Sequence, residues 1–493
     1  MNFPYLSVIV FLPLIGAIVI ALMGAKPRQI KLVAAAFATA SFILSLKVFA
    51  TYDHSLSGVQ FVEKVSWIPG LSVQYYMGVD GLSLPLLLLT TFIGMVAVFV
   101  SWKIDLRVRE YFAWLLVLET GILGVFCSLD LILFFIFWEV ELIPMYLLIS
   151  IWGTGRKEYS AIKFVLYTLI GSALMLAGIL LLYFQAHTFD ITKLADMGLD
   201  GVLTAGMATA IFFLIMFAYM IKLPVFPFHT WLPDAHTDAP TAVSVVLAGV
   251  LLKMGGYGMI RVAVGILPDT AHKWAPLLVV LAVIGVIYGA ALTLRQTDLK
   301  KLIAYSSVSH MGFVLLGIFA LTQVSMTGAV LQMVSHGVIT GLLFAMVGLV
   351  YSKTHQRSIP KLGGLVRQMP VIAVVFSVAG LAALGLPGTS GFAAEVTTFL
   401  GSFGSTMVSG INIYTILAIT GVVLGAGYIL WMLRRVFYGP PRDEFNGVPD
   451  ADLMERVYIY AFVAVIMLIG LYPRIFTDVI KLGVQPILGA FHG

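Results

Sequence analysis

The chain has 493 residues, of which 60% are hydrophobic and 11% charged, whereas soluble globular proteins are about 45–50% apolar and about 25% charged. With a mean hydropathy of +1.02, the composition excludes a water-soluble protein. The single cysteine, Cys127, excludes an intrachain disulfide and a zinc or iron–sulfur site built from cysteines. The net charge of +5 does not indicate nucleic acid, because no basic tract or basic patch with interleaved aromatic residues accompanies it.

A helix needs roughly 20 mainly apolar residues to cross a bilayer, and the sequence contains fourteen such runs. They lie at about 5–24, 31–50, 82–101, 112–128, 131–152, 161–183, 205–228, 240–264, 275–294, 302–321, 327–351, 371–402, 411–433 and 457–473. The runs are nearly continuous rather than alternating, which favours helices over a β-barrel. No basic region precedes the first run and no small-residue cleavage site is evident before Lys26, so we interpret the run as a true span. The sequence therefore predicts an all-α polytopic membrane protein of about fourteen helices.

The basic residues give an independent check, because connections on the cytoplasmic side of a membrane are enriched in Lys and Arg. Fourteen spans divide the connections into two sets, and of the 29 Lys and Arg residues one set holds 19 and the other seven. The remaining three, Lys163, Lys222 and Lys253, lie inside spans. The asymmetry predicts both termini outside and the richer set in the cytoplasm.

Ionisable residues at membrane depth are rare, and they usually face a protein interior and mark an ion path. Besides the three lysines, the spans contain two histidines and four glutamates, namely His310, His336, Glu119, Glu139, Glu141 and Glu395. Lys253 lies near the middle of its run, where a lysine cannot readily reach the interface. The mixture of carboxylates and amines indicates that they pair with one another.

Several of these residues have a structural reading beside the functional one. Glu139 and Glu141 lie about 200° apart around a helix, so both cannot face the same partner; we favour Glu139 for function and leave Glu141 as an equally plausible packing residue. Glu119 could simply cap a neighbouring helix. Lys163 is close enough to a cytoplasmic turn to extend toward water. We therefore assign Glu141 and Lys163 as supporting charges.

Two spans are interrupted by proline. The seventh contains Leu223-Pro224 directly after Lys222, and the twelfth contains Leu386-Pro387 shortly before Glu395. Each proline removes a backbone donor and clashes with a carbonyl four residues back. Broken helices at matching places in two halves indicate inverted repeats around an ion site. We expect two inverted five-helix units, spans 4–8 and 9–13, and hence four segments at 1–110, 111–265, 270–437 and 438–493.

Other kinds of site find no support. No phosphate-binding glycine loop and no dinucleotide fingerprint occur, so we expect no ATP, NADH or other cofactor in this chain. Asp234, His236 and Asp238 have a spacing that could hold a metal, but no fourth ligand is evident. No nucleophile elbow supports a hydrolase.

Several long motifs resemble one family. They are Phe137-Trp138-Glu139-Val140-Glu141-Leu142-Ile143-Pro144, Lys222-Leu223-Pro224 leading to His229-Thr230-Trp231-Leu232-Pro233-Asp234-Ala235-His236, Ala239-Pro240-Thr241, Leu251-Leu252-Lys253, Ala304-Tyr305-Ser306-Ser307-Val308-Ser309-His310-Met311-Gly312 and Leu386-Pro387-Gly388-Thr389. The resemblance is to the antiporter-like membrane subunits of respiratory complex I, the proton-translocating NADH:quinone oxidoreductase, which are similar to subunits of Mrp-type sodium/proton antiporters. Glu395 on the broken twelfth span, and a chain that ends soon after the fourteenth, resemble the M-type subunits, the counterparts of mitochondrial subunit 4.

The resemblance implies a proton path. Glu139 would be the glutamate of the fifth span, Lys222 its partner on the seventh, Lys253 the central lysine and Glu395 the acid on the exit side. His310 and His336 would link Lys253 to Glu395. The implied partners are protons, the lipid bilayer and neighbouring membrane-arm subunits, in a bacterial-type plasma membrane or in an energy-transducing organelle membrane.

Alternatives remain open at this point. The chain could belong to an Mrp-type cation/proton antiporter, or to a related hydrogenase or ferredoxin-driven complex. A purely structural scaffold is disfavoured, since buried ionisable residues on successive spans are costly.

Overall fold

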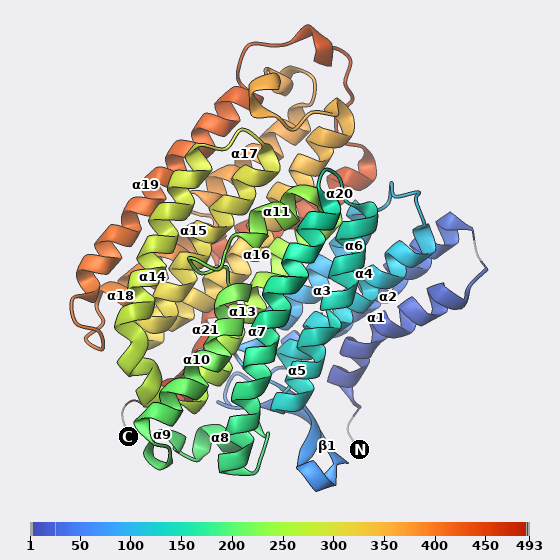
Figure 1. The fold of residues 1–493 in the computed structure, drawn as a ribbon. Coiled ribbons are helices and arrows are strands. Elements are labelled where there is room, and N and C mark those ends of the chain that lie inside the picture. Colours follow the sequence, from blue (N-terminus) through green and yellow to red (C-terminus); the bar gives the residue numbers. More distant parts are fainter. Residues whose placement is uncertain (1–2, 25, 490, 492–493) are drawn as a thin grey trace.

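The computed structural model describes residues 3–24, 26–489 and 491 and shows a helical bundle against which an N-terminal and a C-terminal region pack, in contact with each other. The first region contains α1 (Tyr5–Leu22), α2 (Pro27–Ala50), strands β1 (Gln60–Ile68) and β2 (Val73–Val79), and α3 (Ser83–Val100). The last contains α20 (Leu453–Leu471) and α21 (Arg474–Gly489). In Figure 1 the N and C labels lie at the same end of the bundle, as an even number of spans requires.

The central bundle divides into two consecutive sets of helices. The first set is α4 (Val108–Cys127), α5 (Leu131–Val140), α6 (Leu142–Trp152), α7 (Lys157–Ala186), α8 (Ile191–Asp196), α9 (Leu199–Val202), α10 (Ala205–Lys222), α11 (Trp231–Asp238), α12 (Thr241–Val246), the π-helix η2 (Leu247–Leu251), α13 (Leu252–Gly258) and the π-helix η3 (Met259–Val264). The second is α14 (Pro268–Leu294), α15 (Leu299–Phe319), α16 (Gln323–Thr354), α17 (Pro370–Ala383), α18 (Ser390–Phe403) and α19 (Ile411–Val436). Four short 3₁₀ turns are η1 (Pro69–Leu71), η4 (Ile359–Lys361), η5 (Leu365–Arg367) and η6 (Asp443–Phe445).

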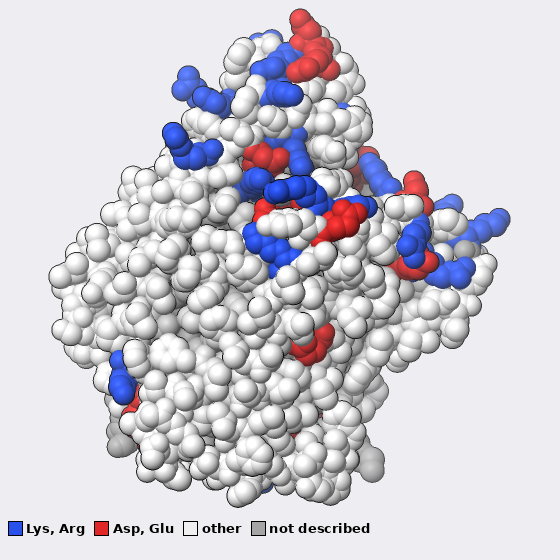
Figure 2. All heavy atoms as spheres, in the orientation of Figure 1, with Lys and Arg blue, Asp and Glu red and all other residues white. Residues whose placement is uncertain are grey.

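The predicted spans are confirmed as helices. Within the described residues, thirteen helices or helical runs are long and apolar enough to cross a membrane. The twelfth predicted span is the broken pair α17 and α18, whose parts are too short to qualify alone. Figure 2 shows a wide band of the surface with few charged side chains and a cluster of them at the upper end, opposite the two termini.

The two sets carry the same backbone feature at opposite ends. Asp130, before α5, forms an antiparallel bridge with Asp190, and Asp298, before α15, forms one with Ser358. Both partners of the second bridge lie 168 residues after those of the first. In each bridge the aspartate also caps its helix, accepting from the backbone N–H of the residues two and three further on. Because five spans separate the bridges, they lie at opposite membrane faces, an arrangement compatible with inverted repeats.

Both predicted helix breaks are present. α10 ends at Lys222, and the chain passes Pro224 and Pro227 before the short buried helix α11 begins at Trp231. α17 ends at Ala383, and α18 begins at Ser390 after Pro387. The sequence did not predict α11 as a helix, because its eight residues hold charged and polar groups with no apolar stripe long enough to recognise.

One element departs from an all-helical protein. β1 and β2 form an antiparallel hairpin, with Val65 opposite Tyr75, between the second and third spans. Lys64 on β1 pairs with Asp190 at 2.8 Å and lies 4.0 Å from the centroid of the Tyr76 ring. Burial alone raises the pKa of Asp190, but the bonds from Lys64 and Thr192 outweigh it and lower the pKa. The hairpin is thereby tied to the outer bridge of the first set.

Helices α16 and α13 occupy the centre of the bundle, and small residues allow their close packing. Nearly every residue of α16 from Ser325 to Val350 is buried. A Cβ at Gly255 of α13 would lie 2.7 Å from both the N of Leu223 and the carbonyl O of Tyr219. Helices in a membrane associate through such contacts, because lipid provides no hydrophobic driving force between them. Gly255 thus holds the break after α10 against the helix of Lys253.

Candidate proton-conducting axis

Glu141 and Lys222 form a buried ion pair in the first set of helices. Glu141 lies where α5 and α6 meet, and Lys222 is the last residue of α10. Both side chains are 1% exposed and are joined by a direct hydrogen bond. The Lys222 ammonium also lies 5.3 Å from the ring centroid of Trp138 and 5.4 Å from that of Phe164. Such a pair is stable only while both charges are present, since a lone buried charge is strongly unfavourable.

The expected pairing of Lys222 with Glu139 is therefore wrong. Glu139 is only half buried and makes no ion pair with any described residue, whereas Glu141 faces the interior. The two residues were expected to face different partners, and the rotation of α5 turns Glu141 rather than Glu139 toward α10. Sequence periodicity gives the angle between Glu139 and Glu141 around one helix, but it does not give the rotation of that helix within the bundle.

Lys163 is a second paired lysine in this set. Its ammonium lies 2.7 Å from a carboxylate oxygen of Asp234 on α11, and both side chains are about one-fifth exposed. Asp234 and His236 were considered as metal ligands, but no group of three or more His, Cys, Asp or Glu side chains suited to a metal occurs among the described residues. Asp234 pairs with a lysine instead.

Lys253 lies at the centre of the bundle between two π-helical turns. Its ammonium donates to the carbonyl of Ala248 and lies 2.9 Å from Nδ1 of His336. A π-helical turn shifts the backbone hydrogen bonds from i+4 to i+5, which frees carbonyls for other donors. The Lys253 side chain is completely buried and has no carboxylate within 4.0 Å in the described structure. The central lysine thus contacts α16 directly, as expected.

His310 on α15 and Glu395 on α18 extend the contact between Lys253 and His336 into the second set of helices. The rings of His336 and His310 have centroids 5.5 Å apart, and Nε2 of His310 lies 3.7 Å from Oε1 of Glu395. Nδ1 of His310 lies 2.8 Å from the carbonyl O of Ser306, and Nε2 lies 2.9 Å from that of Ala383. Carbonyl oxygens only accept, and a neutral imidazole has a single N–H donor. Each ring nitrogen of His310 thus lies beside a carbonyl acceptor, and Nε2 also faces the carboxylate of Glu395.

A small void lies between the two histidines and Glu395. It is lined by His310, Gln332, His336 and Glu395 among others and measures about 10 Å³, close to the lower limit for one water molecule. Nε2 of His336 and Oε1 of Gln332 are buried polar atoms without a hydrogen-bond partner in the described structure. Such orphaned atoms around a water-sized void mark a place where one water would join His336 to the His310–Glu395 pair.

The structure brings five of the six predicted path residues to two clusters. Lys253, His336, His310 and Glu395 form a line, and Lys222 forms the pair with Glu141. No hydrogen bond or ion pair of the described residues joins Lys222 to Lys253, although Gly255 holds their helices together. Transfer between the clusters therefore requires side-chain movement or intervening water.

Sequence reasoning missed three buried ionisable groups. Arg261 and Lys300 were counted as connection residues, yet both are buried, with Arg261 paired to Asp80 at 2.5 Å. The sequence suggests His236 only as a metal ligand, yet it is fully buried and neither ring nitrogen has a hydrogen-bond partner in the described structure. Glu119 is buried as predicted, with its carboxyl group against Gly94 and no ion pair to any described residue. The motif Trp231-Leu232-Pro233 beside the broken span is the sequence signal for a buried α11.

A helical bundle with two broken helices and a line of buried ionisable side chains defines a membrane ion-transport protein. Residues 128–422 match the family described as NADH:quinone oxidoreductase/Mrp antiporter, transmembrane. The chain is 42% identical to NADH-quinone oxidoreductase subunit M of Rhodobacter capsulatus, covering 99% of this chain and 97% of that protein. It is 43% identical to an NAD(P)H-quinone oxidoreductase chain 4 of Synechococcus elongatus, covering 97% and 90%. The chain belongs to this family.

Solved structures show the same fold. A chain of respiratory complex I from Thermus thermophilus is 29% identical and superposes with a TM-score of 0.90 over 99% of this chain and all of that one. A chain of the Mrp complex from Dietzia is 23% identical with a TM-score of 0.84, and the match covers 97% of this chain but 52% of that one. The expected fold and family are therefore confirmed.

Proposed function

We propose that the chain is the M subunit of a respiratory NADH:quinone oxidoreductase and moves protons across the membrane. The observation that carries this proposal is the buried line from Lys253 through His336 and His310 to Glu395. The 42% identity to a subunit M over almost the full length of both chains supports the parent complex. The chain itself holds no redox centre or cofactor in this proposal, and quinone reduction takes place in other subunits.

The first step is a change at the Glu141–Lys222 pair. Glu139, half buried on α5, receives the signal from a neighbouring membrane-arm subunit, and Glu141 then withdraws from Lys222. A lysine left alone in an apolar interior favours its neutral form. Lys222 therefore releases its proton toward Lys253, with Lys163 and Asp234 as supporting charges beside the cytoplasmic end.

The following steps use the second cluster. Lys253 passes a proton to His336, and the water-sized void carries it to His310. His310 passes the proton from Nε2 to the neighbouring carboxylate of Glu395, which releases it outside. Moving one charge costs about 2.3 kcal/mol per 100 mV, and redox chemistry elsewhere supplies this energy.

The orientation is part of the proposal. The cytoplasmic side carries the richer set of Lys and Arg, and both termini face outside a bacterial-type plasma membrane. The four segments 1–110, 111–265, 270–437 and 438–493 would then be the N-terminal helices, the two transporting units and the C-terminal region.

The test compares Lys253→Met with Lys273→Met, an exposed lysine on α14, in inverted membrane vesicles. After assembly is checked on a native gel, quinone reduction and proton uptake are measured together. We expect Lys253→Met to lower the protons moved per electron and Lys273→Met to leave the ratio unchanged. An unchanged ratio in Lys253→Met would exclude the line as the proton route.

A second candidate is a subunit of a cation/proton antiporter, favoured by the fold shared with the Dietzia Mrp chain. It predicts sodium-dependent proton exchange in vesicles that receive no electron donor. Donor-dependent pumping that does not require sodium would contradict it.

A further inference from the structure

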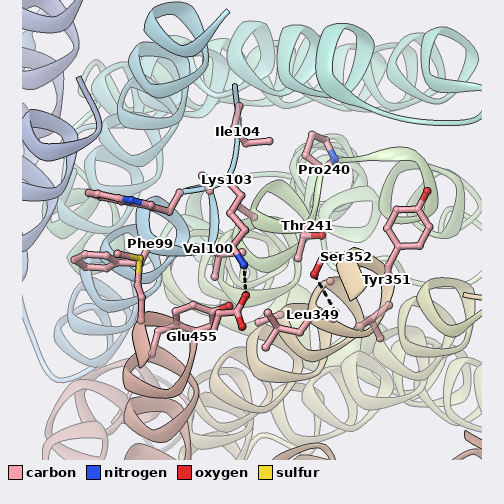
Figure 3. Close-up of a pocket in the computed structure, with 18 of the residues that line it drawn as sticks. Phe99, Val100, Lys103, Ile104, Pro240, Thr241, Leu349, Tyr351, Ser352 and Glu455 are labelled. Atoms are coloured by element: carbon pink, nitrogen blue, oxygen red, sulfur yellow. Dashed lines mark hydrogen bonds and ion pairs between the residues drawn. The ribbon is translucent and has the colours of Figure 1, made fainter. Parts of the chain in front are cut away.

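A cavity of about 540 Å³ has no role in the steps above. It lies where the end of α3, the start of α12, the end of α16 and the start of α20 meet. Figure 3 shows Phe99 and Val100 of α3, Pro240 and Thr241 at the start of α12, and Leu349 of α16 around this space. Pockets that hold small molecules measure about 300–1,000 Å³, so the cavity has the size of a ligand site.

The walls of the cavity are mainly apolar and aromatic. They include Tyr111, Trp152, Leu349 and Tyr458, which are all buried. Water in an apolar space of this kind finds few hydrogen-bond partners, and such spaces take up hydrocarbon groups instead. The walls therefore favour a ligand with an apolar part.

Apolar side chains also border the mouth of the cavity. Leu453 and Met454, at the start of α20, line the space and are 80% and 36% exposed. Tyr351, near the end of α16, lines it as well and is 40% exposed. These residues lie at the end of the bundle where the charged connections gather, which corresponds to a membrane–water interface. An amphiphile can thus enter from one leaflet of the bilayer.

The acidic side chains at the cavity are already paired. The ammonium of Lys103 lies 2.7 Å from Glu455, as the dashed line in Figure 3 shows, and 3.1 Å from Asp452. Lys353 of α16 lies 3.0 Å from the other oxygen of Glu455. Two lysines therefore balance two carboxylates, and this cluster carries no net charge.

Lys300, in contrast, lines the cavity with no carboxylate within 4.0 Å among the described residues. It is 6% exposed, and its ammonium donates to the carbonyl O of Ala239 at 2.5 Å. The neighbouring Arg357 is paired with Asp298 at 2.8 Å. An ammonium has three donors, so two of those of Lys300 remain for a ligand. Because a buried ammonium without a counter-charge is unfavourable, this wall is complementary to an anion.

We propose that this cavity binds a single-chain fatty acid, with its carboxylate at the Lys300 ammonium and its hydrocarbon chain against the apolar walls around Leu349 and Tyr458. One hydrocarbon chain suits the enclosed space, whereas a phospholipid with two chains is too large for it. Binding forms no covalent bond and uses no residue of the Lys253–Glu395 line. The inference therefore stands or falls independently of the proposed function.

The first experiment uses the unaltered assembled complex in nanodiscs of a zwitterionic lipid, with a fatty acid that carries a photoreactive diazirine in its chain. We expect saturable labelling of peptides that contain residues 99–104, 345–352 or 453–458. Laurate should compete for this labelling. Lauryl alcohol has the same chain without the charge, and it should compete at least about tenfold more weakly, because the charge-assisted hydrogen bond to Lys300 is lost. Equal competition by the acid and the alcohol would overturn the anion site.

The second experiment tests the position of the carboxylate. Lys300→Met should weaken competition by laurate at least about tenfold, whereas Lys301→Met, the partly exposed neighbour on α15, should match the wild type. Assembly of both variants is checked on a native gel. Wild-type competition in Lys300→Met would overturn the assignment of Lys300.

The third experiment fills the cavity without changing its charge. Leu349→Trp places a larger side chain in the space and should abolish the saturable labelling, whereas Leu417→Trp, on the exposed face of α19, should retain it. Saturable labelling that persisted in assembled Leu349→Trp would show an adventitious site elsewhere and overturn the proposal. The comparison of laurate with lauryl alcohol uses the unaltered protein, so it decides the question even where a variant fails to assemble.

Discussion

The pairing of single side chains in this protein depends on a few degrees of helix rotation. Glu141 and Glu139 lie on one short stretch, yet only Glu141 reaches Lys222. Both side chains are 1% exposed, so each charge depends on the other for its stability in the apolar interior.

Glu141→Gln should therefore destabilise the assembled complex by about 3–5 kcal/mol, because it leaves the Lys222 ammonium buried and unpaired. The double variant Glu141→Gln with Lys222→Met should recover most of that stability. The stabilities of the wild type, the two single variants and the double variant are compared by thermal unfolding in detergent, which is monitored on native gels. Equal losses in the single and double variants would show that the two side chains are not coupled.

Gln332 provides a second prediction for a single residue. Its orphaned oxygen borders the small void between His336 and Glu395, and Gln332→Leu removes that acceptor. A lost hydrogen-bond partner costs about 1–2 kcal/mol, so proton uptake at saturating donor should fall about tenfold. Gln323→Leu, on the exposed start of the same helix, is the matched control. A wild-type rate in Gln332→Leu would mean that no bridging water is needed.

Among the helices, the contact between α10 and α13 determines how closely the two clusters of charges lie. Gly255 permits it, since any side chain there would meet the backbone of Tyr219 and Leu223. The same packing holds the break after Lys222, where Pro224 ends the helix.

Gly255→Ala should accordingly push α13 away from α10 at a cost of about 1–3 kcal/mol and slow transfer between Lys222 and Lys253. Gly285→Ala on α14 is the control, because a Cβ there meets no atom within 4 Å. Pumping per electron and thermal stability are both measured. If both alanine variants behaved alike, the close approach would have no functional importance.

At the scale of the whole molecule, the two consecutive sets of helices carry the same backbone feature. The matching bridges at Asp130–Asp190 and Asp298–Ser358 lie at opposite faces, and the charged connections gather at one end (Figure 2). A single direction of insertion follows from that asymmetry.

Insertion direction can be measured with added cysteines at exposed positions, since Cys127 is buried. Ser57→Cys, before β1, should react with an impermeant maleimide in intact cells, whereas Asn446→Cys, between α19 and α20, should react only in inverted vesicles. The reverse pattern would place the termini in the cytoplasm and contradict the proposed orientation.

The sequence alone determined the features that depend on local composition. Hydropathy located the helices of the bundle, proline and glycine located both breaks, and the motifs around Glu139, Lys253 and His310 identified the family. These features are readable because lipid requires each span to be apolar and internally hydrogen-bonded, whichever neighbours it has. An ionisable residue in an apolar span is equally visible, which is why Lys253 and Glu395 were found.

Only the tertiary structure decided which of these groups meet. The partner of Lys222 depends on the rotation of α5, and the burial of Lys300 and Arg261 depends on the depth of the ends of their helices. His236 and the hairpin were not anticipated, because α11 and β1–β2 have no long periodic pattern. Rotation and depth are set by contacts between residues far apart in the chain, such as Gly255 with Tyr219, and no local pattern records them.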